Sequence, residues 1–516
     1  MSRRGSRVLF RALLAVAGCA SLSAAAEPKA HHAQKAPKKK PPKPSGKHPP
    51  PAPSPAPPPK VASAPIASHA PTATIERLVL DNGLRVVISP DPRAPVVSIA
   101  VAYDVGSRDD ERGATGLTRL LARAFGQGSA NVLRGEHERL VLARGGDATA
   151  SSGVDRMILA DTAPAGELAL LLWLEADRMK SPKLAPDAIE AQKRGLVAER
   201  ERDDIDPVAA GRARLRELAF QAAFPLEHDP RGAIADLAAL RPDAVRALYE
   251  ARCAASTTVL AITGDFEIDH AVSLVHRFFD TAKKQDKPAH AALPVVPEQT
   301  SQRTATLEDP RARATTVLFG WPLPPLGTDD HDALEAAIDV LAGGPGARLA
   351  QRPSVDKPLA VSVAARFERQ RGPDLATLEI TVADEAARAD AERAVEVEIE
   401  ALAKAGPTDA ELAAYRAHRE AEAWADLADP RRRASLLATT ELVSGDARTL
   451  LADVPRAAAV TREKVRAAVT RWLAPTRRTL VVVGPPRDAS DAPVAAKPGP
   501  ALASPPPKTP KPRGHK

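Results

Sequence analysis

Three residues in the segment Gly113–Ser129 have the spacing of a metal-binding motif but not its chemistry. Arg119, Ala122 and Arg123 stand at positions i, i+3 and i+4, which places them on one face of a helix. The inverted zinc motif H-x-x-E-H puts two imidazoles and a general-base carboxylate at these positions. A guanidinium stays protonated at any working pH and has no lone pair for a metal. The segment therefore predicts a helix that has lost its metal ligands and its base.

Apolar residues in the same segment predict a second, buried face of this helix. They recur at helical spacing, so one stripe of the segment should pack against a core. These residues are Leu117, Leu120, Leu121, Ala124 and Phe125.

The flanks of this helix resemble the insulinase/pitrilysin (M16) peptidase family. Family members commonly read G-S-R-x-E-x-x-G-x-x-G-L-A-H-x-x-E-H-M-x-F-x-G-S, and the run GSRDDERGATGLTRLLARAFGQGS is similar. Further along, GGDATASSGVDRMIL resembles the family's G-G-x-x-N-A-x-T-x-x-D-x-T-x-Y, and LLWLEADRM is similar to the corresponding sequence in family members. The resemblance extends from about Ile75 to Gly484 and describes a member with a degenerate H-x-x-E-H motif. The matching residues of the first run are Gly106, Ser107, Gly113, Gly116, Leu117, Phe125, Gly128 and Ser129.

The resemblance also identifies the position of the distal zinc ligand. GLVAERERDDIDP resembles the family's V-V-L-E-E-I-x-x-x-E-D-D-P and aligns Glu199 with that ligand. One carboxylate does not make the three-ligand site of a catalytic zinc, and Ala122 cannot activate a water. We therefore expect no catalytic residue, no metal ligands and no cofactor here, although active members use zinc. Two arginines one turn apart need a nearby anion, so Glu199 is expected to pair with Arg119 or Arg123.

A second functional feature of the family is missing as well. The resemblance implies an Arg and a Tyr, seven residues apart, that grip the substrate. RLAQRPSVDKPLAVSV resembles the family's R-L-x-x-x-x-R-E-x-x-x-L-A-Y-S-V, in which Ser354 takes the place of the Arg and Val361 that of the Tyr. The substrate-gripping pair is therefore expected to be lost.

The histidines do not restore a metal site at the level of sequence. His137 and His228 lie in loop-like or surface-like contexts, and His31 and His32 lie in a Pro/Lys-rich stretch. Each of them is expected to be solvated rather than to bind a metal.

Charge and composition exclude nucleic acid as an expected partner. The chain of 516 residues has a formal charge of +7, but residues 1–60 carry +11 and residues 489–516 carry +4. The remaining residues therefore carry a net charge of −8. The net positive charge of the chain comes from its two ends and not from the foldable part.

The first 26 residues predict export from the cytoplasm. Four arginines precede the apolar run Ala12–Ala17, which is too short to span a membrane, and small residues follow. Val16-Ala17-Gly18-Cys19 fits a bacterial lipoprotein box, in which Cys19 is lipidated and anchors the chain to a membrane. Ala24-Ala25-Ala26 fits ordinary cleavage, and both alternatives remain open. Either route leads to the periplasm or cell envelope.

The rest of the chain predicts an α+β protein with two homologous domains. Asp81-Asn82-Gly83 between apolar runs is a hairpin signal, and APTRRTLVVVG parallels AASTTVLAITG at an offset of 220 residues. The resemblance implies two M16-type domains, each a mostly antiparallel sheet covered by helices on one face. Together they would form half of a clamshell, with the other sheet faces lining its chamber. The expected divisions are a signal at 1–26, a disordered Pro/Lys/Ala-rich spacer at 27–74, domains at 75–280 and 301–487, a linker at 281–300, and a disordered tail at 488–516.

Three functions are compatible with these features. In the first, the chain is an exported, non-catalytic M16-like protein that binds a peptide or unfolded polypeptide. It would form half of a zinc peptidase complex with an M16-like partner whose motif is intact. Alternatively it is a free-standing envelope scaffold, or an active zinc metalloendopeptidase with relocated ligands. The lost ligands and base favour the first function and predict a protein that is inactive on its own.

Overall fold

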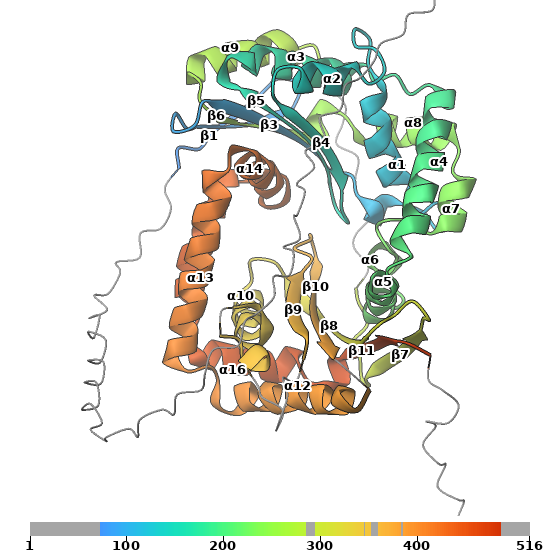
Figure 1. Ribbon diagram of the computed structural model, residues 1–516. Coiled ribbons are helices and arrows are strands. Elements are labelled where there is room, and N and C mark those ends of the chain that lie inside the picture. The colour runs from blue at the N-terminus through green and yellow to red at the C-terminus, as the bar shows by residue number, and fades with distance from the viewer. Residues whose placement is uncertain (1–72, 285–294, 345, 352–359, 383–384, 487–516) are drawn as a thin grey trace, which may run out of the picture. The chain divides into compact units, whose positions relative to one another are not determined.

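The computed structural model describes residues 73–284, 295–344, 346–351, 360–382 and 385–486 (Figure 1). The expected signal with Cys19, nearly all of the 27–74 spacer, Ser354 and the 488–516 tail lie outside the described residues. In the part that is described, no helix has the length and apolar character needed to cross a membrane.

The first sheet has six strands in the order β1-β2-β6-β3-β5-β4. Strands β2 and β6 run parallel, and every other neighbouring pair runs antiparallel. The hairpin expected at Asp81-Asn82-Gly83 is confirmed, because β1 pairs with β2 across it and Gly83 has a φ of +89°. The strands are β1 (Glu76–Val79), β2 (Arg85–Pro90), β3 (Val96–Tyr103), β4 (Asp147–Ser152), β5 (Met157–Pro164) and β6 (Thr258–Gly264).

The second sheet repeats the first without its β1. Its order is β7-β11-β8-β10-β9, and only β7 and β11 run parallel. Strands β11 and β6 therefore occupy equivalent places, which confirms the duplication expected from the 220-residue offset and the α+β fold of two homologous halves. The strands are β7 (Arg303–Glu308), β8 (Thr315–Pro325), β9 (Ser362–Phe367), β10 (Pro373–Val382) and β11 (Thr479–Gly484).

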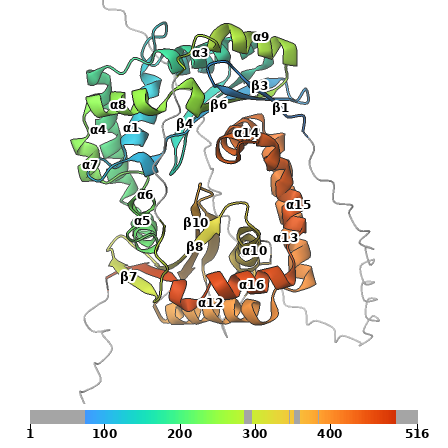
Figure 2. The same ribbon diagram turned by 180° about the vertical axis from the view of Figure 1, so that it is seen from behind.

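Helices surround both sheets (Figures 1 and 2). Between β3 and the end of the first half lie α1 (Leu117–Ala124), α2 (Glu136–Leu142), α3 (Leu168–Lys180), α4 (Pro186–Asp203), α5 (Pro207–Ala219), α6 (Phe224–Glu227), α7 (Ile234–Ala239), α8 (Pro242–Arg252) and α9 (Ile268–Phe279). The second half contributes α10 (Asp329–Ile338), α11 (Arg348–Gln351), α12 (Glu385–Ala405), α13 (Asp409–Ala428), α14 (Pro430–Ser444), α15 (Asp453–Ala458) and α16 (Arg462–Trp472).

The two faces of the first sheet differ in side-chain size. Along β3, Val101 and Tyr103 point into the large core shared with α1, α3 and α9. Their alternating neighbours Ala100 and Ala102 point to the opposite face, as the period of two in a strand requires. Small side chains on that face allow another element to come close to the sheet.

The element that covers this second face is α14, from the other half of the sequence. Its apolar side chains pack on β3 and β6 in one buried cluster (Figures 1 and 2). The helix contributes Ala434, Leu437, Ala438 and Leu442, and the sheet contributes Val87, Ala100, Ala102, Ala160, Val259 and Ala261.

The reverse exchange occurs on the second sheet, which is covered by α5 from the first half. Leu215 of α5 is buried with Leu318 and Val483 of the sheet. At Gly211 a Cβ atom would lie 2.4 Å from the Val483 side chain, so only glycine allows this close approach. The sequence led us to expect these two sheet faces to line a chamber enclosed between halves, and α5 and α14 cover part of both faces.

Charged side chains secure the two exchanged helices. The Arg433 guanidinium of α14 contacts the Asp91 carboxylate at 2.9 Å. Arg77 donates to Glu441 through Nε and Nη2, at 2.8 and 2.7 Å. On the other sheet, Arg212 of α5 binds Glu379 in the same forked way. Forked guanidinium–carboxylate pairs fix direction as well as distance, so they set the register of each helix on its sheet.

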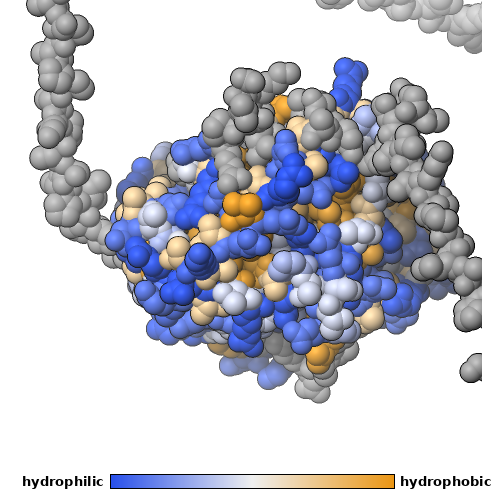
Figure 3. Space-filling view, turned by 90° about the horizontal axis from the view of Figure 1, so that it is seen from below, coloured by the Kyte–Doolittle hydropathy of each residue, from blue (hydrophilic) through white to orange (hydrophobic). Residues whose placement is uncertain are grey.

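The outer surface on the side of α12 has a different character. In Figure 3, which views the molecule from that side, hydrophilic side chains predominate among the described residues and apolar ones are scattered. Apolar side chains scattered among polar ones are normal on a protein surface.

Replacing Leu437 with alanine tests the packing of α14. Leu437 is fully buried against the first sheet, and the loss of its side chain should cost about 2–5 kcal/mol of unfolding free energy. The matched change Leu133→Ala removes a side chain that is 67% exposed and should cost less than about 0.5 kcal/mol. Urea unfolding measures both. Equal midpoints for the two variants would mean that α14 is not part of the core.

Candidate functional site

Helix α1 carries the three motif positions and is fixed on its apolar side. Leu120, Leu121 and Ala124 have no exposed surface, and Phe125 just beyond the helix is 1% exposed. The apolar stripe expected from the sequence therefore faces the core, which turns Arg119 and Arg123 toward α4.

The N-terminus of α1 is held by a buried carboxyl group. Asp110 accepts hydrogen bonds from the backbone N–H groups of Gly116 and Thr118, at 2.8 and 3.0 Å. Burial raises the pKa of Asp110 to about 7, against the effect of these hydrogen bonds. The contacts satisfy amide groups that a helix start leaves without partners, so they fix where α1 begins.

Glu199 on α4 pairs with both motif arginines. Arg119 Nη2 lies 2.6 Å from Glu199 Oε1, and Arg123 Nη2 contacts Glu199 Oε2. The side chains of Arg119, Glu199 and Arg123 are 18, 27 and 45% exposed, so the cluster is partly open to solvent. The ion pair expected from the sequence is present, and each carboxylate oxygen has its own guanidinium.

This donor set does not fit the zinc that the resemblance implies. Arg119 and Arg123 offer no lone pair, Ala122 offers no polar atom, and both oxygens of Glu199 are engaged by cations. A zinc ion placed beside Glu199 would also lie next to two fixed positive charges.

A cavity of about 400 Å³ opens beside these residues. Ala122 and Arg123 form part of its wall, and Thr149 and Ala150 of strand β4 form another part. His137 of α2 also lines the cavity. Its chemistry is therefore that of a polar pocket with one exposed guanidinium, bordered by a sheet edge.

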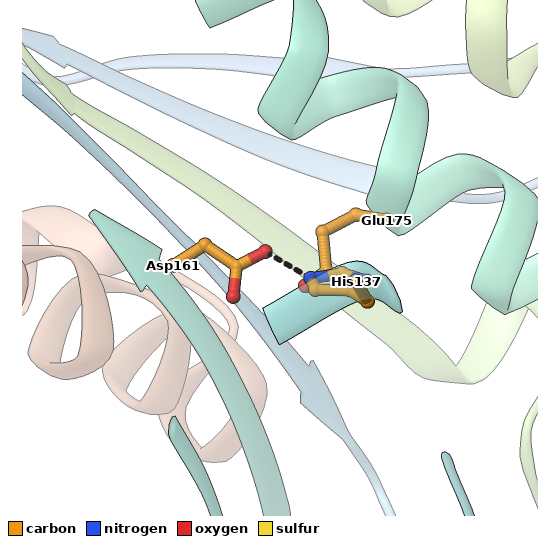
Figure 4. Close-up of side chains that lie close together, drawn as sticks. All are labelled: His137, Asp161 and Glu175. Atoms are coloured by element: carbon orange, nitrogen blue, oxygen red, sulfur yellow. Dashed lines mark hydrogen bonds and ion pairs between the residues drawn. The ribbon is translucent and has the colours of Figure 1, made fainter. Parts of the chain in front are cut away.

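His137 does not lie where the sequence suggested. It is 6% exposed, and its Nε2 lies 2.7 Å from Oδ2 of Asp161 on β5. Glu175 of α3 completes a buried group in which one possible ligand atom from each residue lies within 4.8 Å of the others. Figure 4 shows the three side chains converging from three elements. The expectation that His137 is solvated is wrong.

Burial shifts the proton affinities of this group. It lowers the pKa of His137 to about 4 and raises that of Glu175 to about 7, and it also raises the pKa of Asp161. Burial therefore favours the neutral imidazole of His137 at neutral pH and makes both carboxyl groups easier to protonate.

His228 is also less exposed than expected. Its ring stacks on Phe224 with 4.7 Å between the ring centroids, and its Nδ1 lies 2.7 Å from the carbonyl oxygen of Phe224. Burial lowers the pKa of His228. It packs as a half-buried aromatic residue.

Comparison with known families adds to this geometry. The family model described as insulinase (peptidase family M16) matches residues 85–230, and that described as peptidase M16 inactive domain matches residues 239–418. Together the two matches cover more than half of the 516 residues. The chain belongs to the M16 peptidase family.

Curated relatives of this M16 chain are described as zinc proteases. Zinc protease PqqE of Helicobacter pylori is 25% identical over 352 residues, which is 67% of the M16 chain and 79% of the relative. An uncharacterized zinc protease of Mycobacterium bovis is 26% identical over 430 residues, or 82% of the M16 chain and 94% of the relative.

Solved structures share its fold. A protease from Helicobacter pylori gives a TM-score of 0.74 at 22% identity and covers 80% of the M16 chain and 100% of its own. A peptidase M16 inactive domain from Pseudomonas fluorescens gives 0.70 at 20% identity, covering 80% and 98%. The periplasmic protease PqqL from Escherichia coli gives 0.66 at 16% identity, with 80% of the M16 chain covered but only 48% of PqqL.

Of the expected substrate-gripping positions, only Val361 is described. Its side chain is 69% exposed just before β9, and its backbone N–H donates to the carbonyl oxygen of Thr381 at 2.7 Å. An exposed valine has no group to bind a peptide backbone through its side chain. The loss of the pair remains a prediction at Ser354.

The buried group around His137 had a signal in the sequence of this M16 chain. Glu175 and Arg178 interrupt the apolar run of α3, and Asp161 interrupts that of β5. Charged residues inside apolar segments must find partners when they are buried. The sequence does not predict that α3 and β5 both contact α2 at the same place.

Exchanging Glu199 for glutamine tests the ion-pair cluster. Glu199→Gln leaves Arg119 and Arg123 close together without an anion, and we expect a loss of about 1 kcal/mol of unfolding free energy because the group is partly exposed. The loss should shrink at high salt, which screens the charges. Glu201→Gln, on an exposed position of the same helix, serves as control. Urea unfolding at low and high salt that shows no difference between the two variants would contradict a stabilising role.

Proposed function

We propose that this chain is an exported, non-catalytic M16 protein that acts as the partner subunit, or peptide-binding half, of a zinc peptidase complex. The observation that carries the proposal is the pairing of Glu199 with both Arg119 and Arg123. A water-activating metal and a general base are what this reaction class requires. Neither function can be performed by two guanidinium groups and the methyl group of Ala122.

A peptide-binding role is supported by the edge of the first sheet. Strand β4 ends the strand order, and its residues 149–151 are exposed. An edge strand presents unpaired backbone groups to which an extended peptide can add as a further strand. Arg123, in the wall of the adjoining cavity, would hold a carboxylate of that peptide or of a partner through a forked contact.

A partner subunit is supported by the size of the chain relative to PqqL. The structural match covers 48% of the length of that periplasmic protease. The fold is also similar to a structure described as the first half of PqqL. An M16-like chain with an intact H-x-x-E-H motif would supply the other half and the zinc. Export rests on residues 1–26, with Cys19 as the candidate lipid anchor and the Pro-rich stretch as a spacer.

Two alternatives are distinguished by experiment. A free-standing envelope scaffold would bind polypeptide without a protease partner. An active peptidase with relocated ligands would cleave peptides alone in a chelator-sensitive way.

Restoring the motif tests the non-catalytic part of the proposal. The purified full chain should show no chelator-sensitive peptide hydrolysis. Because Glu199 already occupies the distal position, the triple variant Arg119→His, Ala122→Glu, Arg123→His should bind one zinc ion more per chain than the parent. Zinc uptake is measured by elemental analysis, with the same triple variant carrying Glu199→Gln as control. Hydrolysis by the parent, or equal uptake by parent and triple variant, would contradict the proposal.

Co-isolation tests the partner. The tagged full chain, recovered from envelope extract at native abundance, should bring with it a relative that carries an intact H-x-x-E-H motif. Arg123→Glu should weaken that complex or lower the partner's peptidase activity, whereas Arg277→Glu on α9, also an exposed arginine, should not. A partner that is absent from the isolate and fully active without this chain would leave the scaffold alternative in its place.

A further inference from the structure

A second group of potential metal ligands lies outside the positions of the family's zinc site. His137 comes from α2, Asp161 from β5 and Glu175 from α3, and the three side chains face one another (Figure 4). They are 6, 1 and 0% exposed, so water competes little for them. None of them belongs to the helix face of Arg119, Ala122 and Arg123.

The distances suit a single small cation. One nitrogen or oxygen from each residue lies within 4.8 Å of the other two, and His137 Nε2 is 2.7 Å from Asp161 Oδ2. An ion bound at about 2.0–2.2 Å from each ligand needs donor atoms that already lie this close together. Small side-chain rotations would therefore be enough to complete the coordination.

The charges in this group do not balance. Two carboxylates, Asp161 and Glu175, share one guanidinium, that of Arg178, which binds Glu175 through both Nη2 and Nε. The second oxygen of Asp161, Oδ1, is buried and accepts no hydrogen bond from a nitrogen or hydroxyl group of the described residues, and the Asp161 and Glu175 side chains hydrogen-bond to each other. A buried carboxylate oxygen that accepts no such hydrogen bond is costly, and a bound cation would satisfy it.

The ligand types select the class of metal. One imidazole with two carboxylates suits zinc, manganese or iron, whereas calcium and magnesium prefer oxygen ligands alone. The cavity of about 400 Å³ beside α1 is lined by His137 and Arg178, and it offers a path from solvent to the group.

We propose that His137, Asp161 and Glu175 bind a first-row divalent cation, zinc or manganese, which ties α2 and α3 to strand β5. Arg178, which is buried and contacts both oxygens of Glu175, would share that carboxylate with the cation. The role is structural, and it is independent of the proposed function because it uses no residue of the Arg119–Glu199 cluster.

Metal binding by the full chain tests this site. After dialysis against a chelator, the chain is titrated with zinc chloride or manganese chloride in equilibrium dialysis and with cobalt chloride in visible spectroscopy. We expect a tight site that gives cobalt absorption bands and a melting temperature that rises with cation concentration. Asp161→Asn and His137→Gln should each weaken binding at least about tenfold and remove the cobalt bands. Magnesium should not compete.

The control uses another histidine–carboxylate pair of the same chain. His276 and Asp280 form an exposed pair on α9, with 3.1 Å between His276 Nδ1 and Asp280 Oδ1, so His276→Gln should leave binding unchanged. Histidines in the first 72 residues contribute the same background to every variant. If Asp161→Asn fails to fold, the wild-type measurements decide alone. No cation-dependent rise in melting temperature and no cobalt bands in the wild type, or equal uptake by wild type and Asp161→Asn, would overturn the site in favour of a group neutralised by a proton.

Discussion

The carboxylate of Glu199 is held by two guanidinium groups at the place where the family alignment puts a metal. An ion pair and a bound metal can each compensate the charge of a carboxylate that helix packing has brought near the first sheet. The two differ in chemistry. A metal leaves an open coordination position for water, whereas two guanidinium groups saturate both oxygens and leave nothing to polarise a substrate. In the M16 chain α1 packs against α4, and two guanidinium groups stand where the resemblance puts zinc ligands.

The apolar packing that joins the two halves of the chain does not use the Arg119–Glu199 cluster. Each sheet is covered by a helix from the other half of the chain, α14 on the first and α5 on the second, with Ala100, Ala102 and Gly211 small enough to permit close approach. This exchange joins the two homologous halves through apolar packing and through forked pairs such as Arg77–Glu441. The edge strand β4 belongs to the sheet that α14 covers, and the cavity beside Arg123 lies next to that strand.

Much of the site could be predicted from the sequence, because its signals are local. The spacing of Arg119 and Arg123 and the apolar stripe of α1 both lie within one helix, and alignment with the family was enough to bring Glu199 to them. The duplication was equally accessible, since the strand pattern around Gly264 recurs around Gly484. The exchange of α5 and α14 was not predicted, because a helix with apolar residues does not specify which sheet it covers. His137 was missed for the same reason, because its neighbours Asp161 and Glu175 are distant from it in sequence.

The most direct test of the central claim is a crystal structure of the full chain grown with zinc, with anomalous diffraction recorded on both sides of the zinc absorption edge. The account predicts both oxygens of Glu199 in contact with Arg119 and Arg123, and no anomalous peak within coordinating distance of that carboxylate. A zinc peak bound by Glu199, with the two guanidinium groups turned away from it, would contradict the account.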